Sequence, residues 1–270
     1  MSANNFDAKN IRRTILDMAY SGSTVHIGCA FSIVELLGVL YRNHLKIDPK
    51  LPDSPTRDYM VLSKGHGVMA QYACLKELGI LSDIDINNYF KNGTRLKGLA
   101  DTHVPGVEVT SGTLGHGMSV GVGLALAAKL NGTIQYCYVL IGDGELNEGA
   151  IWEAALFASQ FKLDNLIVIV DENGFQAMGS TNEVISLGNI SKKFEAFGFD
   201  SINIDGHNEK VIDVAYTQMK DFKNGKPKCI VANTVKGKGV SFMEHNNIWH
   251  YTRLSEETYK DALTQLEGRK

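Results

Sequence analysis

The sequence predicts an α/β fold: a doubly wound, mainly parallel sheet with helices on both faces. Three apolar runs, over residues 135–142, 165–171 and 228–234, are unbroken, as in strands that are covered on both faces. Helical patterns over residues 149–161 and 208–220 separate these runs, so strands and helices alternate along the chain. No composition shift marks a boundary, and we expect residues 1–270 to form a single domain.

The N-terminal part of the chain is predicted to be mostly helical. Residues 8–20 repeat apolar side chains at helical spacing. Ser32 and Glu35 form a capping-box pattern at the start of a second helix, which runs to about residue 45. A proline-rich connection then leads to a short apolar strand over residues 59–63.

The rest of the chain contains further helices and one glycine-rich loop. Residues 71–78 are predicted to be helical, and a polar region over residues 82–110 follows. The stretch TSGTLGHGMSVGVGLALAAKL is a glycine-rich loop that continues into an Ala/Gly helix, which can pack closely against its neighbours. The polar tail SEETYKDALTQLEGRK is predicted to be a terminal helix.

Composition excludes several classes of protein. Hydrophobic residues make up 44% and charged residues 21% of the chain, which is typical of a soluble globular protein. The net charge of −3 argues against a nucleic-acid surface, and no apolar run approaches the roughly 18 residues that span a membrane. The first residues lack the apolar segment of a signal peptide, so we expect a cytoplasmic protein. The four cysteines lack CxxC spacing, which favours reduced, buried thiols over a zinc site or disulfides.

Two polar turns carry most of the functional information. Gly142, Asp143 and Gly144 follow one predicted strand, and Asn173 follows the next. Because ligands of open α/β sheets bind at the carboxyl ends of strands, Asp143 and Asn173 should face the same volume. Carboxylate and amide oxygens suit Mg²⁺, and the two glycines allow phosphate to approach the backbone. Each turn alone would be an ordinary turn between strands; together they favour a magnesium and diphosphate site.

The segment GDGELNEGAIWEAALFASQFKLDNLIVIVDENGFQ resembles the thiamine diphosphate motif, and that of the transketolase family in particular. HIGCAFSIVELLGVLY and MVLSKGHG are similar to the two histidine loops of that family. PGVEVTSGTLGHGMSVGVGLALA resembles its glycine-rich cofactor segment, and TVKGKGVSFMEHNNIWH the end of its diphosphate-binding domain. The resemblance covers about residues 10 to 250 and implies the thiamine-diphosphate-binding fold of the diphosphate-binding (PP) type.

The resemblance also implies residue roles. The implied Mg²⁺ ligands are Asp143, Asn173 and the backbone carbonyl of Phe175, and the implied catalytic residues are His26, His66 and His250. The implied cofactor-binding residues are His66, Gly112, Thr113, Leu114, Gly142, Asp143, Gly144, Glu145, Asn173 and Phe175. Asp171 matches a structural acid, and Glu148 and Glu153 match acids that link two cofactor sites across a dimer interface. Without the resemblance, loop histidines and first-turn glutamates are ordinary surface or helix-end residues.

One departure from the family pattern concerns the substrate. Members of the family carry a histidine that touches the donor ketose, and Leu99 stands at that position here. Either His103 takes over this contact after a loop rearrangement, or the contact is lost. The departure leaves open a deoxygenated or otherwise modified sugar as substrate.

The resemblance implies an enzyme that needs a partner. Transketolases have a second domain that binds the pyrimidine ring, and this sequence ends shortly after the first domain would. We therefore expect the N-terminal subunit of a split transketolase, which is a thiamine diphosphate and Mg²⁺ dependent transferase in an α₂β₂ assembly with a separate C-terminal subunit. It would move a two-carbon ketol unit from a ketose to an aldehyde. The alternatives are a deoxyxylulose-phosphate-synthase-like or 2-oxo-acid-decarboxylating thiamine enzyme, and a non-catalytic regulatory subunit.

Overall fold

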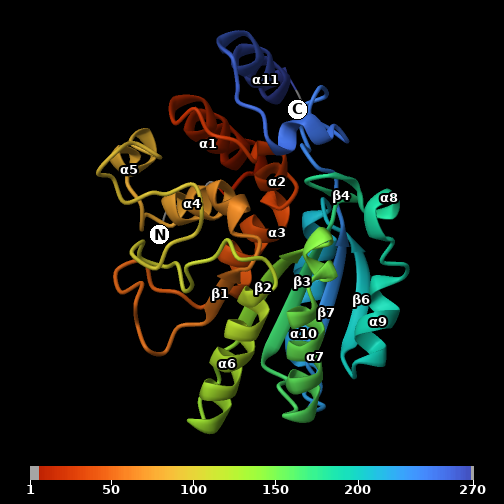
Figure 1. Cartoon of the computed structure of the whole chain (residues 1–270). Coiled ribbons are helices and arrows are strands. Elements are labelled where there is room, and N and C mark those ends of the chain that lie inside the picture. The colour runs from red at the N-terminus through yellow and green to blue at the C-terminus, as the bar shows by residue number, and fades with distance from the viewer. Residues whose placement is uncertain (1–5, 269–270) are drawn as a thin grey trace.

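A five-stranded parallel sheet, ordered β1-β2-β3-β7-β6, forms the centre of the computed structural model, which describes residues 6–268 (Figure 1). The strands are β1 (Tyr59–Leu62), β2 (Cys137–Gly142), β3 (Leu166–Glu172), β6 (Asp200–Asp205) and β7 (Lys228–Asn233). An antiparallel hairpin of β4 (Phe175–Gln176) and β5 (Gly179–Ser180) lies outside this sheet. Since all pairings in the large sheet are parallel, the carboxyl ends of its strands meet at one edge.

Helices precede the sheet, connect its strands and follow it. The α-helices are α1 (Ala8–Ser21), α2 (Ile27–Phe31), α3 (Val34–Val39), α4 (Val68–Glu77), α5 (Asp83–Asn87), α6 (His116–Leu130), α7 (Gly149–Gln160), α8 (Thr181–Ile185), α9 (Ile190–Ala196), α10 (Glu209–Asp221) and α11 (Glu256–Gly268). Single turns of other helix types are η1 (Leu40–His44), η2 (Gly65–Gly67), η3 (Gly144–Asn147) and η4 (Asn247–His250).

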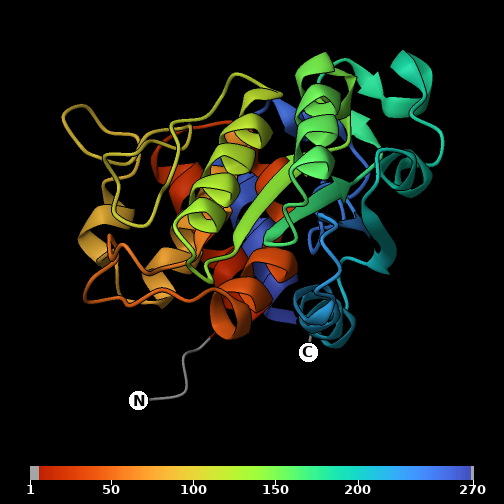
Figure 2. The same cartoon turned by 90° about the horizontal axis from the view of Figure 1, so that it is seen from below.

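Both faces of the sheet are buried, each in its own hydrophobic core. Successive residues of a strand point to opposite faces, so Val139 and Ile141 pack in one core while Tyr138 and Leu140 pack in the other. The first core contains α6, α7 and α9, and the second contains α1, α3, α4 and α10. Figure 2 shows α6 and α7, in green, together on one side of the sheet. The predicted fold class is therefore confirmed, and burial on both faces explains why the central strands are unbroken apolar runs.

The long helices and the four apolar strands are confirmed, with ends shifted by a few residues. The edge strand β6 was not predicted. Its sequence, DSINID, alternates polar and apolar side chains and contains two aspartates, so it lacks the apolar run of the central strands. An edge strand faces solvent along one side, and polar residues there are normal.

The predicted capping box at Ser32 and Glu35 is wrong. Helix α3 begins after Ile33 and has no side-chain cap. The Ser32 hydroxyl instead donates to Asp171 Oδ2 at 2.8 Å, and Glu35 accepts two hydrogen bonds from Arg12 at 2.7 and 2.8 Å. Ser32 therefore connects the N-terminal helices to β3, and Glu35 connects α3 to α1, which a local sequence pattern does not reveal.

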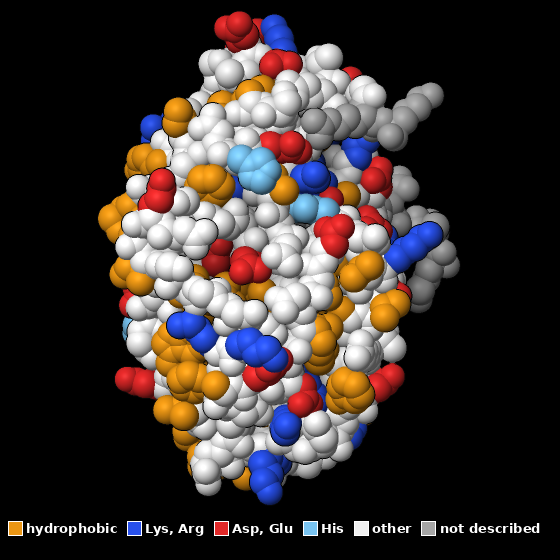
Figure 3. Space-filling view, turned by 90° about the vertical axis from the view of Figure 1, so that its right-hand side faces the viewer, with side chains coloured by type: hydrophobic (Ala, Val, Ile, Leu, Met, Phe, Trp, Pro, Cys, Tyr) orange, Lys and Arg blue, Asp and Glu red, His pale blue; other side chains and the backbone are white. Residues whose placement is uncertain are grey.

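The described part of the chain contains no membrane-spanning helix. The face in Figure 3 carries charges of both signs. No helix within residues 6–268 is long and apolar enough to cross a bilayer. Figure 3 shows Lys and Arg side chains interspersed with Asp and Glu. This mixture agrees with the small net charge of the chain.

Candidate active site

A cavity of about 290 Å³ opens at the carboxyl edge of the sheet. Its lining comes from the ends of β1, β2 and β3, from the loop before α6, and from segments near residues 26–29 and 250. These segments are far apart in the sequence and meet because parallel strands place their carboxyl ends together. The cavity has two chemically different ends, one rich in oxygen ligands and one in nitrogen and sulfur.

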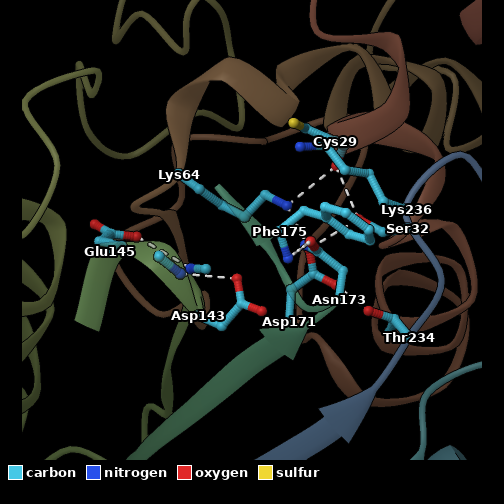
Figure 4. A network of polar contacts seen from close by, with 12 residues as sticks. Cys29, Ser32, Lys64, Asp143, Glu145, Asp171, Asn173, Phe175, Thr234 and Lys236 are labelled. Atoms are coloured by element: carbon cyan, nitrogen blue, oxygen red, sulfur yellow. Dashed lines mark hydrogen bonds and ion pairs between the residues drawn. The ribbon is translucent and has the colours of Figure 1, made fainter. Parts of the chain in front are cut away.

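Asp143 lies at the oxygen end, immediately after β2 (Figure 4). Its carboxylate accepts hydrogen bonds from the backbone N–H of Gly144 at 2.7 Å and of Gly174 at 2.6 Å. Gly174 follows Asn173, so the second bond joins the two strand-end loops. The predicted meeting of these loops is confirmed. Burial is the main cause that raises the pKa of Asp143 to about 7, and the negative charge of Asp171 is the second. A bound cation would therefore stabilise the ionised carboxylate.

Asp171 is the centre of a fully buried network. It accepts hydrogen bonds from Lys64 at 2.5 Å, from Asn173 at 2.7 Å, and from the hydroxyls of Ser32 and Thr234. Burial opposes ionisation, but the charge of Lys64 and these hydrogen bonds outweigh it and lower the pKa of Asp171. The network fixes the orientation of Asn173, and the structural role implied for Asp171 agrees with its burial.

Glu145 is buried at the same edge. One carboxylate oxygen accepts from Ser63 and from the backbone N–H of Gly115 at 2.8 Å, and the other from Gly142 N–H at 3.2 Å. These bonds tie the end of β1, the glycine-rich loop and the end of β2 to one another. Burial raises the pKa of Glu145. Although Glu145 borders the cavity, its hydrogen bonds identify it mainly as a residue that positions the surrounding loops.

Three histidines meet at the nitrogen end of the cavity. The ring centroids of His26, His66 and His250 lie 5.2–5.6 Å from one another. The backbone N–H of His26 donates to the carbonyl of His250 at 3.1 Å, which connects the two segments. Burial lowers the pKa of all three imidazoles, and that of His250 falls to about 3. They are therefore neutral near pH 7 and can donate as well as accept hydrogen bonds.

Two buried lysines border this group, and the sequence did not identify either as a site residue. Lys236 donates to His250 Nδ1 at 2.8 Å and to Asn247 at 2.7 Å, and its ammonium lies 5.8 Å from the centre of the Phe175 ring. Lys64 binds Asp171 as described above. Lys64 follows β1 and Lys236 follows β7, so the strand-end rule that selected Asp143 would also have selected both lysines. Together they provide the positive charge that an anionic ligand requires.

The residues at the oxygen end fit Mg²⁺ with a diphosphate. Asp143, the Asn173 amide and the Phe175 backbone form a set of hard oxygen donors next to two lysines. A Cβ atom at Gly144 would lie 2.7 Å from Gln176 Cβ, so only glycine leaves the turn its present shape. Gln176 also places a buried side-chain nitrogen without a hydrogen-bond partner at this cavity. A polar ligand would satisfy that nitrogen.

The remaining predicted residues divide into those at the cavity and those away from it. Gly112 and Leu114 line it, whereas Thr113 between them is exposed. Leu99 lines it as well and contacts the backbone of Gly112. His103 is bonded to Asp101 at 2.6 Å on the surface, with its side chain 86% exposed. Leu99, and not a rearranged His103, therefore forms this part of the wall.

Comparison with known proteins gives a consistent result. Residues 4–267 match a family model described as "Transketolase, thiamine diphosphate binding domain". The chain is 39% identical to an apulose-4-phosphate transketolase subunit of Phocaeicola vulgatus, over 96% of this chain and 92% of that protein. It is 41% identical to a 6-deoxy-6-sulfo-D-fructose transketolase subunit of Clostridium sp. (strain MSTE9), over 96% and 94%.

Longer proteins match over part of their length. The chain is 31% identical to human transketolase, over 97% of this chain and 42% of that protein. Among solved structures, transketolase from Campylobacter jejuni superposes with a TM-score of 0.91 at 34% identity, over 96% of this chain and 42% of that one. The chain thus spans about two-fifths of these longer proteins and nearly all of the two shorter relatives.

Proposed function

This chain belongs to the transketolase family, and from that premise we propose that it is the thiamine diphosphate and Mg²⁺ binding subunit of a split transketolase. The assembled enzyme would transfer a two-carbon ketol unit from a ketose to an aldehyde acceptor. The relatives named as apulose-4-phosphate transketolase subunits are matched over 92–94% of their length, which supports a chain of the same kind. We further propose that residues 1–270 act as one diphosphate-binding domain in the cytoplasm.

The hydrogen bond between Gly174 and Asp143 is the observation that carries this proposal. It brings two strand-end loops together, so that a carboxylate and an amide border one cavity. We propose that Asp143, Asn173 and the Phe175 carbonyl hold Mg²⁺, and that Gly144 admits the diphosphate to the backbone.

Other residues of the cavity would complete cofactor binding. The proposed contacts to the remainder of the cofactor come from His66, Gly112, Leu114, Gly142 and Glu145, which line the cavity, and from the exposed Thr113 beside them. We add Lys236 to these, since its ammonium lies 5.8 Å from the centre of the Phe175 ring and can pair with phosphate oxygens. When bound, thiamine diphosphate supplies the carbanion chemistry of the reaction, and the protein supplies orientation and proton transfer.

The histidines are the proposed proton carriers. His26, His66 and His250 are neutral at pH 7 because burial, together with the nearby lysine charges, lowers the pKa of each ring. A neutral imidazole can accept a proton from a sugar hydroxyl and return it later. His250 accepts from Lys236 at Nδ1, which leaves its other nitrogen, Nε2, carrying a proton that it can donate.

The part of the cavity wall that Leu99 forms suggests which substrate the site accepts. Leu99 cannot form a side-chain hydrogen bond, and it borders both the cavity of the site and an adjoining cavity of about 450 Å³. The two similar proteins are named for apulose 4-phosphate and for 6-deoxy-6-sulfo-D-fructose. We propose that the donor of this enzyme is likewise a modified ketose that lacks a hydroxyl where it meets Leu99.

The proposed partner is a separately encoded C-terminal subunit that binds the pyrimidine ring, in an α₂β₂ assembly. Human transketolase is longer than the matched region, and the shorter relatives are named as subunits, which implies that each has a partner chain. Glu148 and Glu153, at the start of α7, are exposed and free to meet another chain. We propose that they link the two cofactor sites of the assembly.

Calorimetric titration tests the proposed function. We expect thiamine diphosphate to bind the chain, with its partner present, only when Mg²⁺ is added. No Mg²⁺-dependent binding would favour the non-catalytic regulatory role. Assays with ketose phosphates and with pyruvate then separate transketolase activity from 2-oxo-acid decarboxylation; turnover of pyruvate alone would contradict the transketolase assignment.

A further inference from the structure

Cys29 lies in the same corner of the cavity as two of the histidines. All four cysteines are free and buried, as the sequence predicted. Cys29 differs from the others because its Sγ is 3.5 Å from His250 Nδ1. One ligand atom each from Cys29, His66 and His250 lies within 4.8 Å of the other two, and residues 6–268 contain no other such group of three. The fold therefore assembles a sulfur and two nitrogens that are too far apart in sequence for a spacing rule to detect.

This arrangement has the chemistry and nearly the dimensions of a metal site. Metal–sulfur bonds of about 2.3 Å and metal–nitrogen bonds of about 2.0–2.1 Å give a sulfur–nitrogen edge of about 3.6 Å in a tetrahedral site. The distance between Cys29 and His250 already equals that edge. The ligand atom of His66 lies within 4.8 Å of the other two, so it must approach them by about 1.5 Å at most, which a side-chain rotation can supply.

We propose that Cys29, His66 and His250 form a second metal site, which takes a soft or borderline divalent cation such as Zn²⁺ or Cd²⁺. Thiolate and imidazole select such ions, whereas the carboxylate and amide at the other end of the cavity select Mg²⁺. Two metals of different character thus have separate sites in one cavity, distinguished by ligand type. All three ligand residues line the cavity, so water from it could complete the tetrahedron.

Binding requires two changes in the site. The Cys29 thiol loses its proton to solvent as the metal–sulfur bond forms, so one proton is released for each ion bound. The ammonium of Lys236, 2.8 Å from His250 Nδ1, must also move away from that nitrogen. Lys236 and Lys64 oppose a cation, and the new thiolate charge offsets part of that opposition.

The proposed metal would act as an inhibitor of cofactor binding. This consequence rests on the proposed function, in which His66 and Lys236 contact thiamine diphosphate. An ion that holds His66 and displaces Lys236 removes both contacts, so the soft metal and the cofactor should exclude each other. Metal binding itself does not depend on the proposed function and can be measured alone.

Titration of the cofactor-free chain with Cd²⁺ tests the site directly. We expect one ion per chain and the ultraviolet charge-transfer band of a cadmium–thiolate bond. Cys29→Ser should abolish the band. The matched control is Cys74→Ala, which alters a buried cysteine of the hydrophobic core and should leave the band unchanged. A band that survives in Cys29→Ser, with circular dichroism showing a folded protein, would refute the site.

Lys236→Met provides a second test in the opposite direction. Removing this positive charge and freeing His250 Nδ1 should increase Cd²⁺ affinity roughly tenfold, whereas damage to the fold would lower it. Unchanged or weaker binding in this variant would contradict the proposed geometry. Competition with thiamine diphosphate and Mg²⁺, measured with the partner subunit present, then separates the two proposals. Cd²⁺ binding without cofactor binding in that assembly would leave the metal site intact and reject the proposed function.

Discussion

The two ends of the cavity are built differently. At the oxygen end, Asp143 and Asp171 each accept at least two hydrogen bonds, and their surroundings are fixed by buried contacts. At the nitrogen end, His26 and His66 meet through a ring contact, and Lys236 donates to His250 and Asn247. We conclude that the oxygen end is preorganised by the fold and that the nitrogen end keeps its hydrogen-bonding groups available for a ligand.

The largest effect is expected from breaking the buried ion pair at the oxygen end. Lys64→Met leaves Asp171 ionised and without its countercharge, and we expect a loss of about 3–5 kcal/mol in the free energy of unfolding. Urea denaturation measures this. The control is Lys260→Met, which removes an exposed ion pair with Glu256 and should cost less than about 0.5 kcal/mol. Similar losses in both variants would show that the pair does not preorganise the site.

The next effect concerns binding and not folding. Asp143→Ala should weaken Mg²⁺-dependent binding of thiamine diphosphate more than about 100-fold, because it removes a direct metal ligand. The fold should persist, since the alanine removes an unfavourably buried carboxylate. Calorimetry at fixed Mg²⁺ measures the change. Asp221→Asn alters an exposed carboxylate at the end of α10, which leads to the amino end of β7 and so to the opposite edge of the sheet; it serves as control, with an expected change of less than about twofold. Wild-type affinity in Asp143→Ala would contradict the metal assignment.

The two aspartates should respond oppositely to pH. The pKa of Asp143 rises from 3.8 to about 7 on folding, so its ionisation in the folded chain reduces stability as pH increases from about 4 through 7. The pKa of Asp171 is lowered, so its ionised form stabilises the fold. This stabilisation is lost only when the pH falls below the usual pKa of an aspartate. In the metal-free chain, we therefore expect the Tm of Asp143→Asn minus that of the wild type to increase as the pH rises from about 4 through 7. A constant difference in Tm would mean that Asp143 keeps an ordinary pKa.

The contrast between strand ends and loops also explains which contacts the sequence could predict. Asp143 and Asn173 directly follow strands, so their meeting follows from parallel topology alone. Lys64 also follows a strand, so the same rule places it at this edge of the sheet, but no local pattern pairs it with Asp171, 107 residues away. Cys29 reaches His250 across 221 residues. Strand ends are thus predictable from the periodicity of the chain, whereas pairings between loops depend on packing that no local pattern encodes.

The smallest effect is expected at the wall between the two cavities. Leu99→His adds a hydrogen-bonding ring where the side chain is 42% exposed, so the fold should tolerate it. We expect kcat/KM of the assembled enzyme for a fully hydroxylated ketose phosphate to increase by about fivefold, since one hydrogen bond contributes roughly 1 kcal/mol. Leu99→Met changes shape without adding a polar group and should give no gain. An equal gain with methionine would mean that Leu99 restricts space and does not select against a hydroxyl. The wall at Leu99 would then owe its effect on specificity to shape alone.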